Sequence, residues 1–335
     1  GKHVVTANKA LIAHHGHDLA ARAEAAGMLL AAEAGVAGGI PVLRALGEGL
    51  AGDRATRVFG VLNGTCNYIL TGMAATGRSY EAVLEEAQLK GYAEADPAFD
   101  VDGVDAAHKL AILAAMAFGT RIDFEGVVTE GISRITAADI ETAADMGFTI
   151  KLLGLARLHA DGLEQRVRPC MVRADTIIGA LPDVTNAVVI EGADMGACTF
   201  TGPGAGAGPT AAAVLSDVLD AARGRVDPFF GRPAAGLVPA ERLAHGAEHS
   251  PYYLRFTLAD RPGALAALAS ALGEAGISIH RMRQYGRADA IADGAVPVVI
   301  VTHDTRRDAV DAALARIGAL PVSAAAPVAI RIETV

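Results

Sequence analysis

The sequence has little cysteine, and its cysteines are not arranged for disulfide or metal bonding. Cys66, Cys170 and Cys198 are odd in number, far apart, and form no CxxC pair. This spacing predicts neither a disulfide framework nor a zinc site. The pattern fits a reducing compartment, and we therefore expect a cytoplasmic protein.

Long apolar runs and runs of like charge are also missing. The longest apolar stretches, such as residues 110–119, are about half as long as a bilayer requires, and the N-terminus lacks the charged-then-apolar order of a signal peptide. The 29 basic and 38 acidic residues give a net charge of −9. These features argue against nucleic-acid and membrane partners and favour small-molecule chemistry.

The chain is long enough for two or three domains. It has 335 residues, of which 52% are hydrophobic and 20% charged, as is typical of a globular protein. It begins with Gly1 and enters an apolar run, HVVTAN, at once. A natural domain seldom begins inside a buried strand, so we expect further sequence upstream of Gly1.

Residues 90–109, KGYAEADPAFDVDGVDAAHK, place several carboxylates ahead of an apolar helix, LAILAAMAFG. Asp102 stands at the N-cap position of that helix, and Asp105 and Lys109 share one helix face at spacing i,i+4. A cap with a surface ion pair explains this spacing about as well as a functional site does. A calcium loop is excluded because Ala98 and Lys109 fall where it needs carboxylates. The apolar residues that follow favour a lysine at the edge of a cavity, where it can deliver a proton.

The N-terminal residues predict a strand over 3–8, a helix over 11–27 and a second strand over 28–35. That order implies a right-handed βαβ unit of a doubly wound sheet, with Asn8 and Lys9 at the carboxyl end of a strand. In the following EAGVAGGIPV, Glu33 and backbone carbonyls could hold a hard cation. A tight turn before a helix explains the same glycines better.

Two further glycine-containing turns precede predicted helices. Residues 54–62 predict a strand that leads into NGTCNYIL, where residues 63–65 form a turn whose following helix could bind an anion through backbone amides. GPGAGAG, residues 202–208, also precedes a helix. It lacks the GxGxxG spacing of a dinucleotide motif, and close strand–helix packing explains its glycines at least as well.

The remaining segments predict a mixed sheet, a linker and a small domain. Residues 123–149 read as polar helices and turns with a capping signal from Thr136 to Asp139. Residues 223–250 carry prolines and glycines without a period, which predicts a linker. From Tyr252 onward the pattern reads βαββαβ, the order of a ferredoxin-like domain. Strand-like runs occupy residues 166–172, 187–192 and 197–202.

Five motifs, in order, resemble those of the homoserine dehydrogenases in the bacterial form with a C-terminal ACT regulatory domain. They are GKHVVTANKALIA, EAGVAGGIPV, VLNGTCNYIL, KGYAEADPAFDVDGVDAAHKLAIL and TGPGAGAGPTAAAVLSDV. The resemblance implies an α/β chain with the end of a Rossmann-type domain, a mixed-sheet domain for substrate binding and dimerisation, and a ferredoxin-like ACT domain. The implied divisions are residues 1–42, 43–200, a returning helix over 201–222, a linker over 223–250 and the ACT domain over 251–335. The family's glycine fingerprint has no counterpart here, so we expect the first part of its Rossmann domain to be missing.

The resemblance implies reversible reduction of L-aspartate 4-semialdehyde to L-homoserine with NADP or NAD, in threonine, methionine and isoleucine biosynthesis. Lys109 would exchange the proton, Asp105 would orient it, and Lys9 would lie between cofactor and substrate. The implied substrate-binding residues are Glu94, Asp100, Gly64 and Thr65. The implied cofactor-binding residues are Lys9, Asn8, Gly204, Ala205 and Gly206. A sodium ion would meet Glu33, Val36, Gly38 and Ile40.

The same resemblance implies a homodimer or homotetramer, and threonine as effector. The effector loop would comprise Asp260, Arg261, Pro262 and Gly263, where a glycine allows close approach and helix amides receive a carboxylate. The alternative function is a catalytically inactive fragment that keeps amino-acid sensing and dimerisation. Another semialdehyde or hydroxyacid dehydrogenase would need an arginine near the site, and the acidic stretch contains none.

Overall fold

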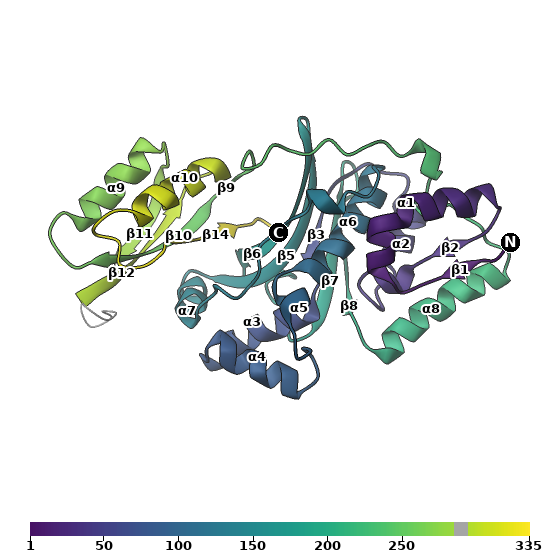
Figure 1. Cartoon of the computed structure of the whole chain (residues 1–335), viewed down its shortest axis with the longest axis horizontal. Coiled ribbons are helices and arrows are strands. Elements are labelled where there is room, and N and C mark those ends of the chain that lie inside the picture. Colours follow the sequence, from purple (N-terminus) through teal and green to yellow (C-terminus); the bar gives the residue numbers. More distant parts are fainter. Residues whose placement is uncertain (285–293) are drawn as a thin grey trace. The chain divides into compact units, whose positions relative to one another are not determined.

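The computed structural model describes residues 1–284 and 294–335, which divide into two compact units, Gly1–Arg242 and Leu243–Val335 (Figure 1). Unit 1 joins a small parallel strand pair to a larger mixed sheet covered by helices. The described part of unit 2 combines β-strands with α-helices. Among the described residues no helix combines the length and apolar character needed to cross a membrane.

A strand–helix–strand motif opens unit 1. β1 (Val4–Val5) and β2 (Leu30–Ala31) pair in parallel, with α1 (Lys9–Ala25) between them in the chain. This confirms the predicted order and the parallel pairing that it requires. The helix begins earlier than predicted because Asn8 caps it: the Asn8 side chain accepts a hydrogen bond from the backbone N–H of Leu11 at 3.0 Å.

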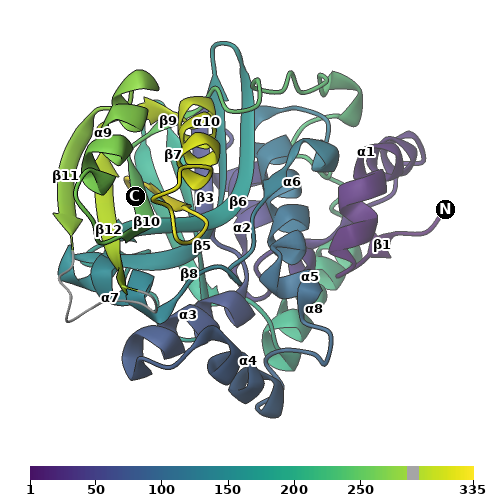
Figure 2. The ribbon, with the colours of Figure 1, turned by 60° about the vertical axis from the view of Figure 1, so that its left-hand side comes forward.

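The large sheet of unit 1 (Figure 2) has the strand order β6-β5-β3-β7-β8, with antiparallel neighbours. Strand β4 adds to β6 in parallel. Its strands are β3 (Ala55–Val61), β4 (Val128–Thr129), β5 (Phe148–His159), β6 (Gly162–Arg173), β7 (Thr185–Gly192) and β8 (Gly196–Pro203). The predicted mixed sheet is confirmed. The sequence prediction placed no strand at β5, although its pairing with β6 runs along the whole of both strands.

The helices of unit 1 pack around this sheet. They are α2 (Val42–Arg44), α3 (Gly64–Thr76), α4 (Tyr80–Leu89), α5 (Ala98–Val101), α6 (Val104–Phe118), α7 (Ala137–Asp145) and α8 (Ala207–Ala222). Helix α6 contacts β3, β5 and β6, and every residue from Asp105 to Met116 is buried. A capping box of Thr136 and Asp139 opens α7, as predicted.

The N-cap prediction for Asp102 is wrong. The N-cap of α6 is Gly103, which adopts φ +85°, a left-handed conformation that glycine tolerates best. Asp102 instead ends the single turn of α5 in a right-handed helical conformation. The predicted N-cap lies one residue too early because the sequence pattern does not reveal the short helix α5 before it.

Unit 2 has the predicted βαββαβ order. Its elements are β10 (Tyr252–Ala259), α9 (Ala264–Glu274), β11 (Ile279–Gln284), β12 (Ala295–Thr302), α10 (Arg307–Gly318) and β14 (Val328–Ile332), with β9 (His249–Ser250) paired to β13 (Thr305–Arg306). The main strands lie in the order β11-β12-β10-β14 with antiparallel neighbours. Leu254, Phe256, Leu268, Ile300 and Val310 lie in its core.

Part of the predicted linker packs onto unit 1. Phe230, Ala234 and Leu237 are buried, and the backbone N–H of Leu163 donates to the carbonyl of Glu241 at 2.7 Å. Unit 1 accordingly extends to Arg242.

Candidate functional site

A cavity of about 580 Å³ lies in unit 1 where the ends of several elements meet. This volume falls within the range of ligand pockets. Its lining comes from the start of α1, the loop after β2, the N-terminus of α3, one face of α6, the start of β7 and the loop before α8. Its lining includes Lys9, Gly38, Asn63, Gly64, Thr65, Tyr92, Asp100, Asp105, Lys109, Val184, Asn186, Gly204, Ala205 and Gly206. We call it the Asp105 cavity.

The Asp105 carboxylate joins three side chains from different elements. The Lys109 Nζ donates to Asp105 Oδ2 at 2.6 Å, one helical turn along α6. The Lys9 Nζ lies 3.2 Å from Asp105 Oδ1, and the Asn63 amide donates to Asp105 at 2.9 Å. The structure therefore brings together the two predicted lysines and their predicted partner, from residues about a hundred positions apart.

The pKa values of the two cavity carboxylates are shifted in opposite directions. Burial works to raise the pKa of Asp105, but Lys109 first and then Lys9 and Asn63 outweigh it, so the pKa lies below the usual value. Burial raises the pKa of Asp100, and the hydrogen bond from Asn63 at 2.8 Å opposes this only in part. Asp105 is the carboxylate that stays ionised most readily.

Lys109 is the more enclosed of the two lysines. Its side chain is 10% exposed, against 30% for Lys9, and its Nζ also donates to the Leu62 carbonyl at 2.7 Å. A lysine ammonium has three N–H donors, of which two are used here. The side chain lines the cavity, so the third can reach a bound oxygen.

Asn63 links the two carboxylates of the Asp105 cavity. The sequence prediction gave it no site role. Its amide nitrogen donates to Asp100 and Asp105, and its carbonyl oxygen accepts the backbone N–H of Cys66 at 2.8 Å, which caps α3. The order strand–Asn–Gly–Thr–helix is the signal that could have found it, since asparagine between a strand and a helix is a preferred N-cap and fixes its side chain at the helix start.

Glycines form the opposite wall. Gly38 has φ +55°, and a Cβ there would lie 2.4 Å from the Gly204 carbonyl oxygen. A Cβ on Gly204 would lie 2.1 Å from the Asn186 side-chain amide. Asn186 is 1% exposed, and neither its oxygen nor its nitrogen has a hydrogen-bond partner in the described part of the chain. An unpaired buried amide in a cavity wall is costly unless a ligand or water meets it.

Two of the predicted substrate- and cofactor-binding residues lie outside this lining. Glu94 is exposed, beyond Tyr92, and its backbone carbonyl accepts from the Gln88 side chain at 3.0 Å. The Asn8 side chain caps α1 instead of facing the cavity. Their binding roles stay predictions.

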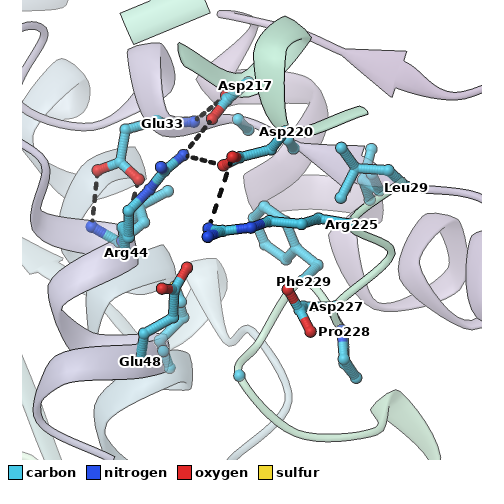
Figure 3. Close-up of a pocket in the computed structure, with 17 residues that line it drawn as sticks. Leu29, Glu33, Arg44, Glu48, Asp217, Asp220, Arg225, Asp227, Pro228 and Phe229 are labelled. Carbon is cyan, nitrogen blue, oxygen red and sulfur yellow. Dashed lines mark hydrogen bonds and ion pairs between the residues drawn. The ribbon is translucent and has the colours of Figure 1, made fainter. Parts of the chain in front are cut away.

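The Glu33 carboxylate caps α2. Its two oxygens accept the backbone N–H groups of Leu43 and Arg44, each at 2.9 Å, and Arg44 also bridges to Asp217 and Asp220 of α8 (Figure 3). Burial raises the pKa of Glu33 to about 7.

A cation at the predicted sodium site would have to compete with these two amides for the Glu33 side chain. Val36 and Ile40 are buried, and the Ile40 carbonyl accepts the backbone N–H of Val42 at 2.8 Å. Among the described residues no group of three or more histidine, cysteine, aspartate or glutamate side chains could hold a metal ion. The sodium site stays a prediction.

The predicted effector loop lines a cavity of its own in unit 2. Asp260, Arg261, Pro262 and Gly263 face a space of about 380 Å³ together with Gln284 and residues of β12. Gly263 has φ +88° and is the N-cap of α9. This geometry is that of a helix N-terminus open to a small anionic group.

Comparisons with known proteins agree with the motifs. The homoserine dehydrogenase family model matches residues 41–219, and the ACT domain model matches residues 252–319. A homoserine dehydrogenase of Pseudomonas aeruginosa is 44% identical, over 99% of this chain and 78% of its own length. The chain belongs to the homoserine dehydrogenase family. The expected family and the ACT domain are thereby confirmed.

Solved homoserine dehydrogenases share the fold. A crystal structure from Thiobacillus denitrificans matches with a TM-score of 0.92 and 42% identity, covering 100% of this chain and 77% of its own. A hyperthermophilic archaeal homoserine dehydrogenase in complex with NADPH matches at a TM-score of 0.58 and 29% identity, covering 66% of this chain and 64% of its own. Homoserine dehydrogenases are NAD(P)-dependent oxidoreductases.

The Asp105 cavity fits the nicotinamide end of such a cofactor. Gly38 and Gly204 let the loop after β2 and the loop before α8 pack closely at this wall, and the unpaired Asn186 amide offers both a donor and an acceptor to a polar group. Lys9 and Thr65 lie on the same lining.

Proposed function

We propose that the chain catalyses the reversible reduction of L-aspartate 4-semialdehyde to L-homoserine, with the Asp105 cavity as its active site. The observation that carries this is the ionised Asp105 carboxylate, which holds the ammonium groups of Lys109 and Lys9 at one wall of that cavity. When bound, the nicotinamide supplies or accepts the hydride, and the protein must position the carbonyl and move a proton.

Lys109 is the proton donor and acceptor in this proposal. Asp105 and the Leu62 carbonyl fix its Nζ from two sides and leave one N–H for the substrate oxygen. As negative charge develops on that oxygen, the ammonium stabilises it first by charge and then by proton transfer. Lys9, bound to the other oxygen of Asp105, adds positive charge to the same wall.

The substrate ammonium would meet a carboxylate beside the Asp105 group. Asp100 lines it and is held by Asn63 at 2.8 Å. The Thr65 hydroxyl donates to the Tyr92 carbonyl at 2.7 Å, which ties the start of α3 to the segment that carries Glu94. Glu94 contributes to substrate binding if this segment closes over the ligand.

The test compares Lys109→Ala with the control Lys90→Ala. We expect Lys109→Ala to lower kcat by roughly 10²–10⁴ with the fold intact, as expected for a lost general acid. Lys90 lies on the surface, where it pairs with Glu86, so its loss should leave kcat nearly unchanged. A folded Lys109→Ala enzyme within about threefold of wild type would remove Lys109 from the mechanism.

We further propose that unit 2 senses a small amino acid, with threonine as the leading candidate. The support is the cavity beside residues 260–263, with Gly263 at the N-terminus of α9. A homodimer or homotetramer and a cytoplasmic location complete the proposal. The edge position of β8 in the sheet of unit 1 supports the assembly, because an edge strand can pair with another chain. The three free cysteines support the cytoplasmic location.

A further inference from the structure

A buried lysine on β5 binds the turn at residues 181–186. Lys151 is 2% exposed, and its Nζ donates to the Asn67 side-chain oxygen at 2.8 Å and to the Leu181 carbonyl at 2.6 Å. Asn67, on α3, is 1% exposed, and its amide nitrogen points to the carbonyls of residues 181, 182 and 185 at 3.3–3.4 Å. We call these two side chains the Lys151 pair.

The Lys151 pair matches the chemistry of this turn. The turn presents carbonyl oxygens to the interior, and lysine and asparagine side chains supply the donors that these oxygens need. Asp183, at the tip, adopts φ +44°, which is uncommon for a residue other than glycine. Such conformations persist where the surroundings hold them, and they cluster at functional sites.

The turn ends in the wall of the Asp105 cavity. Val184 and Asn186 both line it. The Val184 carbonyl lies against Gly64, where a Cβ would approach it to 2.8 Å, and the Asn186 amide lies against Gly204. A shift of the turn would therefore move the two glycine segments that face cofactor and substrate.

We propose that Lys151 and Asn67 are positioning residues, which set the 181–186 turn and through it the glycine wall of the active site. This inference rests on the proposed function for the identity of the cavity. Burial of an ammonium in the sheet is costly and lowers the pKa of Lys151 to about 8. An apolar side chain would fill the same space without that cost, but it could not bind the turn.

Three variants of the protein test this proposal. Lys151→Met keeps the length of the side chain and removes its donors. Asn67→Asp keeps an acceptor for Lys151 and removes the donor to the turn, so it is expected to fold even if Lys151→Met does not. Leu153→Ala is the control, because Leu153 is fully buried two residues along β5 and faces the same side of the sheet.

The readouts are kcat/KM and amide hydrogen exchange at residues 183–186. We expect Lys151→Met and Asn67→Asp to lower kcat/KM by roughly 10–100-fold and to speed exchange in the turn, as a small misplacement of the wall would do. Leu153→Ala should lower the melting temperature while kcat/KM stays within about threefold of wild type.

Two results would overturn the proposal. One is a folded Lys151→Met or Asn67→Asp enzyme with kcat/KM and turn exchange equal to wild type. The other is an equal loss of kcat/KM in Leu153→Ala, which would mean that any damage to β5 has this effect. Absence of homoserine oxidation by wild type would instead refute the proposed function, and hydrogen exchange would then decide alone whether the pair sets the turn.

Discussion

At the scale of single residues, the partners of the Asp105 carboxylate lower its pKa more than burial raises it. Burial alone would favour the neutral acid, yet Lys109, Lys9 and Asn63 together keep the pKa below its usual value. Removal of one partner would leave a buried charge less well compensated. The changes in the free energy of unfolding caused by substitutions at these positions should therefore not be additive. Lys109 is the less exposed lysine, and its charge therefore acts on a bound oxygen with less solvent screening.

Lys151 makes stability depend on pH. Its pKa falls from 10.5 in the unfolded chain to about 8 in the fold, because burial disfavours the charged form. Between these pH values the unfolded state binds more protons, so the free energy of unfolding rises with pH. We expect wild type to gain on the order of 3 kcal/mol relative to Lys151→Met across this window.

Urea unfolding of both proteins below, within and above that window measures this effect. The difference between the two curves is the readout, since other groups titrate equally in both. Parallel curves would show that Lys151 is not desolvated in the fold.

At the scale of elements, the glycine wall depends on close approach between three segments. Gly204→Ala would place a Cβ 2.1 Å from the Asn186 amide, which is buried and has little room to move. We expect a loss of about 1–3 kcal/mol of stability and a lower kcat/KM, because the backbone must shift. Thermal unfolding and steady-state assays with homoserine measure the two effects.

Gly208→Ala is the matched control for that substitution. A Cβ on Gly208 meets nothing within 4 Å, and the residue lies in α8, where alanine favours the helix by up to about 1 kcal/mol. If Gly204→Ala and Gly208→Ala had equal stability and equal kcat/KM, the glycine wall would tolerate displacement.

The sequence predicted the elements whose signals are local. Thr136 and Asp139 form the predicted capping box of α7, and the βαββαβ pattern of unit 2 follows from its alternating runs. The spacing of Asp105 and Lys109 predicted their ion pair, because residues four apart share a helix face. These features need no knowledge of distant partners.

The parts that the sequence did not predict depend on tertiary contacts. β5 lacks a clear alternation and contains Lys151, whose burial makes sense only beside Asn67 and the 181–186 turn. Asn186 reads as an ordinary strand residue until Gly204 is seen against it. Motif spacing along the chain carries no information on such packing, so these residues became visible only in the fold.

At the scale of the whole molecule, the two units carry different cavities. The Asp105 cavity of unit 1 has the lysines and the carboxylates, whereas the cavity of unit 2 is lined by the 260–263 loop. In the proposed function, catalysis and sensing therefore belong to separate compact units of one chain. Regulation then requires that an effector bind the active and less active states of the enzyme with different affinity.

Gly263→Asp tests this division of labour. The residue has φ +88°, where an aspartate is strained, and the added charge would lie at the cavity that is to receive a carboxylate. Allosteric couplings of about 1–3 kcal/mol change affinity roughly 5–150-fold, so millimolar threonine should inhibit wild type. The variant should need at least about tenfold more threonine for the same degree of inhibition. Uninhibited activity should be equal in both, since the substitution is in unit 2.

Gly273→Asp is the control for that experiment, because it makes the same charge change on α9 at a position where a Cβ meets nothing within 4 Å. It should keep the inhibition of wild type. Calorimetric titration with threonine then separates a lost binding site from a lost coupling: Gly263→Asp should show no heat of binding where wild type does. Equal inhibition of wild type and Gly263→Asp would exclude the 260–263 loop as the sensor, whatever the activity of unit 1.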